Sequence, residues 1–170
     1  YTAPHWPWEG PLDEKKSKSL KSGNYAWISD GGSLATYANM MISLDNGIGK
    51  VMQALRSKKL EENTIVIFTS DNGGERFSKN WPFSGQKGQL LEGGLRVPAI
   101  VQWKGGIKPA ETDQVAITMD WPATILEATG TPQDPNFPFD GLNLLPLMKK
   151  EVPDFERKIF WRMKDQDAVR

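Results

Sequence analysis

The sequence predicts an α/β protein. Residues 32–59 have the apolar spacing of a helix, a continuous apolar run follows at 63–70, and a second such run covers 97–103. Short apolar runs rich in β-branched residues, with little alternation, are typical of strands covered on both faces by helices. We therefore expect helices and sheet in separate layers.

The helix predicted over 32–59 has one apolar face. Ser33 can cap its N-terminus, and Arg56, Lys58 and Lys59 suit the negative end of the helix dipole. The apolar residues recur at three- and four-residue steps, which places them on one side of a helix. They are Leu34, Tyr37, Ala38, Met41, Leu44, Ile48, Val51, Met52 and Leu55.

Three shorter elements are predicted in the second half of the chain. Residues 119–130, "MDWPATILEATG", read as a helix with Asp120 as its N-cap and Gly130 as its stop. The apolar stretch 142–148 is a short helix candidate, and 158–163 is a possible strand. No internal repeat and no shift in composition marks a domain boundary, so 170 residues are consistent with a single domain.

Composition excludes several classes of function. Lys plus Arg and Asp plus Glu both number 21, so no overall field attracts nucleic acid or an anionic membrane. No apolar run reaches the length of a membrane span, and the absence of cysteine excludes disulfides and thiolate chemistry within this stretch. A basic loop with Lys15, Lys16, Lys18 and Lys21 is either a solvated linker or a contact for an acidic glycan.

Asp71 and Asn72 follow the apolar run 63–70, in "FTSDNGGERF". Ligands bind beyond the carboxyl ends of strands in α/β sheets, and these side chains offer hard oxygen ligands for Ca²⁺ or Mg²⁺. Gly73 and Gly74 permit unusual backbone angles and the close approach of a bulky anion. The same four residues are also ordinary turn chemistry, so spacing alone leaves a metal site and a plain turn open.

A glycine-rich loop, "FSGQKGQLLEGGLRVP", covers 83–98. Lys87 can approach an anion there without steric cost, and Glu92 and Arg96 can form an ion pair that shapes the loop. A surface loop with scattered charges is the alternative. A phosphate-binding Walker loop is excluded, because the required Gly-Lys-Ser/Thr does not follow the glycines.

His5 is the single histidine and lies between Pro4 and Trp6-Pro7. Prolines stiffen the backbone, and imidazole is the side chain best suited to proton transfer near neutral pH. His5 is therefore a candidate proton donor, and the alternative is a solvent-exposed or structurally satisfied histidine.

Taken together and in this order, these motifs resemble the sulfatase family of the alkaline-phosphatase superfamily. The resemblance is carried by "APHWP", "SLDNGIGKVMQALR", "NTIVIFTSDNGG", "GQKGQLLEGGLRVPAIVQW", "TMDWPATILEATG", "DGLNLLPLM" and "IFWRMKDQDAVR". It implies an alkaline-phosphatase-like α/β/α sandwich with a mixed, largely parallel sheet, incomplete in this chain. Residues 1–170 would then be a single partial sulfatase domain.

The resemblance implies a role for each candidate residue. Asp71 and Asn72 match the family's late pair of metal ligands, usually to Ca²⁺, with Mg²⁺ possible. Lys87 matches the lysine that contacts the sulfate group. His5 matches the histidine that contacts sulfate and helps to protonate the departing alcohol, so His5 and Lys87 are the expected catalytic and substrate-binding residues.

The implied reaction is hydrolysis of a sulfate ester, either an aryl sulfate or a sulfated glycan. Its nucleophile is a formylglycine made in a Cys/Ser-x-Pro-Ser/Ala-Arg motif, and this sequence contains no such motif. We therefore expect the nucleophile and the early metal-binding aspartates upstream, and a small C-terminal subdomain downstream. The isolated chain should be inactive.

Two alternatives and several open points accompany this interpretation. A phosphodiesterase or phosphonate monoester hydrolase of the same superfamily would share the fold and the metal site, and a non-catalytic anion-binding module would keep only the scaffold. Relatives are often periplasmic or secreted, but the sequence itself leaves compartment and oligomeric state open.

Overall fold

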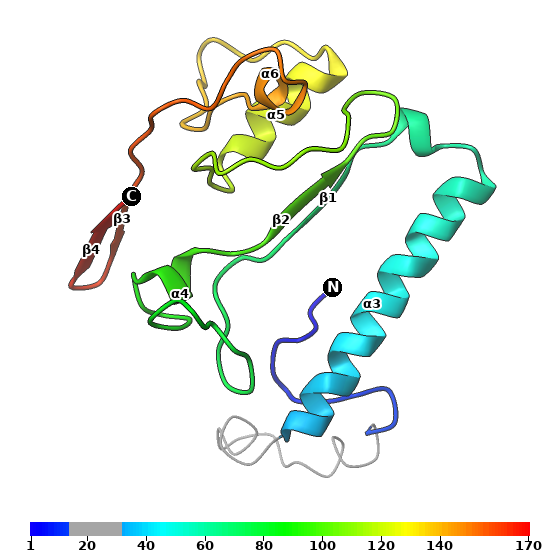
Figure 1. The fold of residues 1–170 in the computed structure, drawn as a ribbon, viewed down its shortest axis with the longest axis vertical. Coiled ribbons are helices and arrows are strands. Elements are labelled where there is room, and N and C mark those ends of the chain that lie inside the picture. The colour runs from blue at the N-terminus through cyan, green and yellow to red at the C-terminus, as the bar shows by residue number, and fades with distance from the viewer. Residues whose placement is uncertain (14–31) are drawn as a thin grey trace. The chain divides into compact units, whose positions relative to one another are not determined.

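The structure is a computed structural model that describes residues 1–13 and 32–170 (Figure 1). The chain forms two compact units, Tyr1–Leu60 with Arg76–Ser78, and Glu61–Glu75 with Lys79–Arg170. The predicted basic loop at residues 15–21 lies outside the described residues. Among the helices that are described, none is long and apolar enough to cross a membrane.

The first unit is built on helix α3, Leu34–Ser57 (Figure 1). Ser33 caps it as predicted, since the Ser33 Oγ accepts a hydrogen bond from the Thr36 N–H at 3.0 Å. The predicted apolar face is only partly covered. Leu44 is buried, whereas the side chains of Leu34 and Val51 are 64% and 46% exposed. Met40, which the spacing did not include, is also buried.

An aromatic cluster attaches the N-terminal segment to α3. The Trp8 ring lies edge-on to Phe77 and Tyr37, with centroid distances of 5.2 and 6.0 Å. Edge-to-face packing of this kind stabilises a contact beyond its buried area. Gly32 has φ +84°, and a Cβ there would lie 2.5 Å from the Trp8 Cγ. The segment that carries His5 is therefore held by packing within this unit.

The second unit contains a two-stranded antiparallel sheet of β1, Val66–Thr69, and β2, Ala99–Gln102 (Figure 1). Phe68 pairs with Ile100, and Ile67 pairs with Val101. Both strands were predicted, but the expectation of cover on both faces is wrong for the described residues. Ile100 is 62% exposed, and the helices of this unit pack on the other face of the ribbon, which carries Ile67 and Val101.

Helices α5, Asp120–Thr129, and α6, Leu145–Met148, cover that other face. Side chains from the sheet and both helices surround an apolar cavity of about 10 Å³. The lining includes Ile67 and Val101, and the buried residues Leu144, Leu145 and Leu147 complete this core. Gly130 ends α5 as predicted, in the left-handed conformation with φ +65°.

Asp120 does not cap α5, which corrects the prediction. The N-cap is Met119, and Asp120 is the first helical residue and fully buried. Its carboxylate accepts hydrogen bonds from the backbone N–H groups of Ile117 and Leu142, and from both terminal nitrogens of Arg157 at 2.6 and 2.8 Å. A carboxylate in the core needs such partners, whereas a cap at the surface would bond its own helix.

The chain ends in a hairpin of β3, Phe160–Met163, and β4, Gln166–Val169, paired antiparallel (Figure 1). The prediction included β3 but not the polar strand β4. It also missed a 3₁₀ turn, Glu61–Asn63, and the single-turn helix α4, Glu92–Leu95. Both sheets within 1–13 and 32–170 are antiparallel pairs, so the largely parallel sheet that the resemblance implies is not formed by these residues.

Candidate functional site

The turn with Asp71 and Asn72 begins two residues after β1 ends at Thr69, as predicted. Asp71 is exposed and Asn72 is partly exposed. The Ser70 Oγ donates a hydrogen bond to the Asn72 carbonyl oxygen at 2.9 Å, which fixes the backbone of the turn. The two residues therefore lie just beyond the carboxyl end of β1, which pairs with the start of β2 at Thr69 and Ala99.

Gly73 is required because another part of the backbone passes directly over it. A Cβ at this position would lie 1.8 Å from the Gly93 carbonyl oxygen, and the Gly73 N–H donates to the Gly94 carbonyl oxygen at 2.8 Å. Gly73 thus accommodates the chain's own glycine-rich loop, whereas the close approach of an anion stays a prediction. This contact joins the Asp71–Asn72 turn to the loop that carries Lys87.

Asn80 completes this junction. Its side-chain oxygen accepts from the Gly74 N–H, and its side-chain nitrogen donates to the carbonyl oxygens of Gly74 and Gly85, all at 3.0 Å. One amide group therefore satisfies backbone groups of both segments. The spacing analysis missed Asn80, because its partners become visible only when the turn and the loop are folded together.

Lys87 is held at its backbone and paired at its side chain. Its N–H donates to the Gly74 carbonyl oxygen at 3.0 Å. Its ammonium lies 3.7 Å from a carboxylate oxygen of Glu75, and the lysine side chain is 30% exposed. Glu75 is a second residue that the spacing did not single out. The Lys87 ammonium thus lies beside Glu75, the residue that follows Gly74 in the chain.

The rest of the glycine-rich loop is closed by internal bonds and one ion pair. The Gly93 N–H donates to the Ser84 carbonyl oxygen at 2.7 Å. The predicted pair of Glu92 and Arg96 forms at 3.7 Å. Glu92 also binds Arg170 at 2.5 Å, a partner that lies far along the sequence and that periodicity cannot indicate.

Asp71 and Asn72 fit a divalent cation as part of its ligand set. Carboxylate and amide oxygens suit Ca²⁺, which takes six to eight oxygen ligands, and Mg²⁺, which takes six. Within 1–13 and 32–170, no group of three or more histidine or carboxylate side chains is placed to hold a metal ion. The pair supplies two donors of the right chemistry, and a complete site needs further ligands.

His5 is exposed and lies in the first unit, in the segment before α3. Its Nδ1–H donates to the Trp6 carbonyl oxygen at 2.7 Å, and its ring lies 4.5 Å from the Trp6 ring. A carbonyl oxygen only accepts hydrogen bonds, so this contact assigns a proton to Nδ1. The structure thus joins the backbone of Lys87 to Gly74, two residues after Asn72, in the second unit, and describes His5 in the first.

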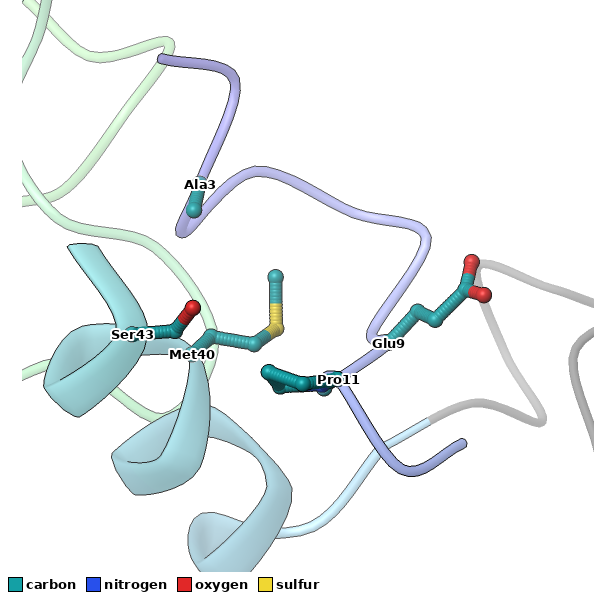
Figure 2. A pocket seen from close by; sticks show the side chains of 6 residues that line it. Ala3, Glu9, Pro11, Met40 and Ser43 are labelled. Atoms are coloured by element: carbon teal, nitrogen blue, oxygen red, sulfur yellow. The ribbon is translucent and has the colours of Figure 1, made fainter. Parts of the chain in front are cut away.

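A hollow of about 350 Å³ also lies in the first unit, between the N-terminal segment and α3. Figure 2 shows Met40 and Ser43 of α3 facing it, with Ala3 and Pro11 of the segment opposite. None of the four candidate site residues lines this hollow. Its volume therefore gives no support to a catalytic role.

Comparisons with known proteins give the family. The family model described as "Sulfatase" matches residues 1–131. Human arylsulfatase A is 35% identical over 140 residues, which is 79% of this chain and 27% of that protein. The chain spans about a quarter of the length of the curated relatives it matches.

Solved structures agree with this relationship. The structure of Ps i-CgsB in complex with k-i-k-neocarrahexaose is 26% identical, with a TM-score of 0.77 over 99% of this chain and 37% of the other. The PsFucS1 sulfatase from Pseudoalteromonas sp. is 29% identical, with a TM-score of 0.70 over 79% of this chain and 29% of the other. The fold class is thus the alkaline-phosphatase-like α/β class that the sequence predicted, and the chain belongs to the sulfatase family.

Proposed function

We propose that these 170 residues are part of a longer sulfatase and contribute one portion of its active site for sulfate ester hydrolysis. One observation carries the proposal. The chain belongs to the sulfatase family, and two contacts join its turn with Asp71 and Asn72 to its loop with Lys87. One is the Asn80 amide, and the other is the hydrogen bond from the Lys87 N–H to the Gly74 carbonyl oxygen. The backbones that carry the oxygen donors and the cationic side chain are thereby joined to each other.

Lys87 is proposed to bind the sulfate group through its ammonium. A sulfate ester is anionic, and charge develops on its oxygens as the ester bond breaks, so a fixed cation at that point stabilises the transition state. In the structure the Lys87 ammonium pairs with the Glu75 carboxylate. A bound sulfate would replace this carboxylate or bind the ammonium together with it, since sulfate and carboxylate are both oxyanions.

Asp71 and Asn72 are proposed to hold a divalent cation, Ca²⁺ or Mg²⁺. When bound, such a cation neutralises negative charge on a sulfate oxygen and on an attacking oxygen. Asp71 would contribute a carboxylate and Asn72 a neutral amide oxygen, both from the turn after β1. The formylglycine nucleophile and the remaining ligands are proposed to come from outside these residues.

His5 is proposed to give a proton to the departing alcohol oxygen. Because its Nδ1–H is bonded to the Trp6 carbonyl oxygen, the donated proton would come from Nε2. The ring would therefore act as an imidazolium that carries a proton on each nitrogen, and the transfer would leave the neutral ring with its proton on Nδ1. Protonation of a leaving oxygen by a positioned imidazole accelerates bond cleavage, and a proline-stiffened segment suits that positioning.

The proposed substrates are an aryl sulfate or a sulfated glycan. Human arylsulfatase A supports the first class by its name. The second is supported by the similarity to a structure solved with k-i-k-neocarrahexaose, an oligosaccharide, bound. The net charge of zero means that recognition of either substrate falls to local groups such as Lys87.

The decisive experiment measures kcat/KM for an aryl sulfate in the complete polypeptide that carries this chain. Lys87→Ala should lower kcat/KM by about a hundredfold or more, the usual cost of removing one transition-state donor. Glu92→Gln should cost roughly tenfold or less, because Glu92 only shapes the loop. Lys104→Ala is the matched control, since this lysine is 58% exposed and pairs with Glu61.

Equal losses for Lys87→Ala and Glu92→Gln would overturn the role of Lys87. Assays with an aryl phosphate and a phosphonate monoester separate the related reaction classes. Faster turnover of either than of the sulfate would replace sulfatase activity by phosphoryl or phosphonate hydrolysis. Absence of turnover on all three, with the fold intact, would leave a binding module.

A further inference from the structure

The C-terminal hairpin contacts the loop that carries Lys87, although the two are far apart in sequence. Figure 1 shows the hairpin of β3 and β4 beside the region of α4. The backbone N–H of Leu90 donates to the Gln166 Oε1 at 3.1 Å. The Gln166 Nε2 lies 3.5 Å from the Gly88 carbonyl oxygen. One side-chain amide therefore binds the backbone just after Lys87.

A second anchor lies at the far end of the same strand. The Arg170 guanidinium contacts both carboxylate oxygens of Glu92 at 2.5 Å. The backbone of Arg170 is fixed in turn, because its N–H and C=O pair with those of the buried residue Ile159 at 3.0 and 2.8 Å. Glu92 opens α4, so the hairpin contacts the loop on both sides of Leu91.

The loop needs such external contacts because its own composition favours mobility. Gly85 and Gly88 flank Lys87 closely, and both have positive φ, +88° and +83°. No atom of the described residues lies within 4 Å of the Cβ position at Gly88. Glycines of this kind cost conformational entropy when they are ordered, and side-chain packing cannot hold them.

We propose that Gln166 is a positioning residue for Lys87, with Arg170 as a supporting anchor. By binding Leu90 and Gly88, Gln166 restricts the backbone on the C-terminal side of Lys87, while the bond to Gly74 fixes the lysine's own N–H. The ammonium then samples a narrow range of positions. This inference rests on the proposed role of Lys87 as a sulfate-binding residue.

The test combines hydrogen exchange with a double-mutant cycle in the complete polypeptide. Gln166→Ala removes both loop contacts. Gln166→Glu keeps an oxygen acceptor for the Leu90 N–H. Arg162→Ala is the matched control, because it lies in the same hairpin but pairs only with Asp167, with the two side chains 82% and 67% exposed. Exchange is followed for the amides of residues 86–91, and kcat/KM is measured with and without Lys87→Ala.

We expect Gln166→Ala to speed exchange in residues 86–91 about tenfold and to lower kcat/KM about tenfold, as small displacements of a positioned group do. In the Lys87→Ala background the same substitution should change kcat/KM less than about twofold, because its target is gone. Gln166→Glu should restore most of the exchange protection, and Arg162→Ala should leave both readouts unchanged.

Unchanged exchange in Gln166→Ala, or an equal loss of kcat/KM in both backgrounds, would overturn the proposal. If Lys87→Ala itself keeps full activity, the proposed function of Lys87 fails. The exchange of residues 86–91 then decides alone whether Gln166 orders the loop, so the two failures are distinguishable.

Discussion

At the scale of single residues, Asp120 shows how a buried charge can organise a core. Burial by itself raises the pKa of the Asp120 carboxyl, but hydrogen bonds from Arg157 and from the backbone of Ile117 and Leu142 outweigh it. The pKa therefore lies below its ordinary value. Thr124 extends the network, since its Oγ1 donates to the Asp120 carbonyl oxygen and accepts from the Leu144 N–H. The start of α5 is thereby tied to the start of α6.

Removing the Asp120 charge should destabilise the protein strongly. Asp120→Asn leaves Arg157 without its counter-charge in a site where that side chain is 12% exposed, so we expect a loss of about 3 kcal/mol in unfolding free energy. Urea denaturation of the purified chain measures it. The control is Asp167→Asn, which breaks an exposed pair and should have little effect. Similar losses for the two variants would contradict the role assigned to Asp120.

The same carboxylate predicts how stability depends on pH. Because its pKa is lower in the folded state, Asp120 contributes stability that is fully present above the unfolded value of about 3.9 and is lost as pH falls through the folded value. Unfolding free energy should therefore drop below about pH 4. The drop should be smaller in Asp120→Asn, and an identical acid profile in both proteins would exclude Asp120 as a source.

At the scale of elements, capping and packing contribute separately to α3. Ser33→Ala removes the bond from the Thr36 N–H to the Ser33 Oγ and should lower stability by about 1 kcal/mol. Ser57→Ala, at the other end of the helix, loses only a bond to the Ala54 carbonyl oxygen and should stay within about 0.5 kcal/mol of wild type. Thermal unfolding by circular dichroism compares them, and equal shifts would argue against a specific cap.

Elements that depend on adjacent residues could be predicted from the sequence, and elements that depend on distant residues could not. The helical period of α3, its cap at Ser33 and the end of α5 at Gly130 depend on adjacent residues, and the structure confirms them. Strand β4, "QDAV", has no strand-like composition. It forms because it pairs with β3. Gln166 and Arg170 also bind the glycine-rich loop, more than seventy residues earlier in the chain.

At the scale of the whole molecule, the chain covers only part of the proteins it resembles. It spans 37% of the Ps i-CgsB structure and 27% of arylsulfatase A. Exposed apolar residues such as Ile100 and Leu34 lie in elements that the sequence predicted to be covered. The apolar pattern therefore fixes which face of an element is apolar, and the rest of the fold decides whether that face is covered.

The purified 170-residue chain should not hydrolyse an aryl sulfate. The sequence contains neither a cysteine nor a Cys/Ser-x-Pro-Ser/Ala-Arg motif, so no formylglycine can form in it. The proposed metal ligands Asp71 and Asn72 would supply only two of the oxygens that a Ca²⁺ ion takes. Release of the phenol is followed spectroscopically at high chain concentration, with Ca²⁺ present. Turnover that scales with chain concentration and disappears in Lys87→Ala would disprove this expectation.

The sequence by itself determined the residue types of the candidate site and their place after a strand or in a glycine-rich loop. Asp71, Asn72, Lys87 and His5 stand in motifs whose order identifies the family. These features are readable because backbone preferences and ligand chemistry depend on a few adjacent residues.

Only the tertiary structure decided which segments meet. Four contacts join separate segments of the folded chain. They are the Gly93 carbonyl oxygen over Gly73, the Asn80 amide between turn and loop, the pair of Glu75 with Lys87, and the Gln166 contact with Leu90. Such contacts depend on the packing of the folded chain, and no periodicity in one sequence encodes them. The physical reason is that hydrogen bonds and close approaches between distant residues form only after the core has placed their backbones.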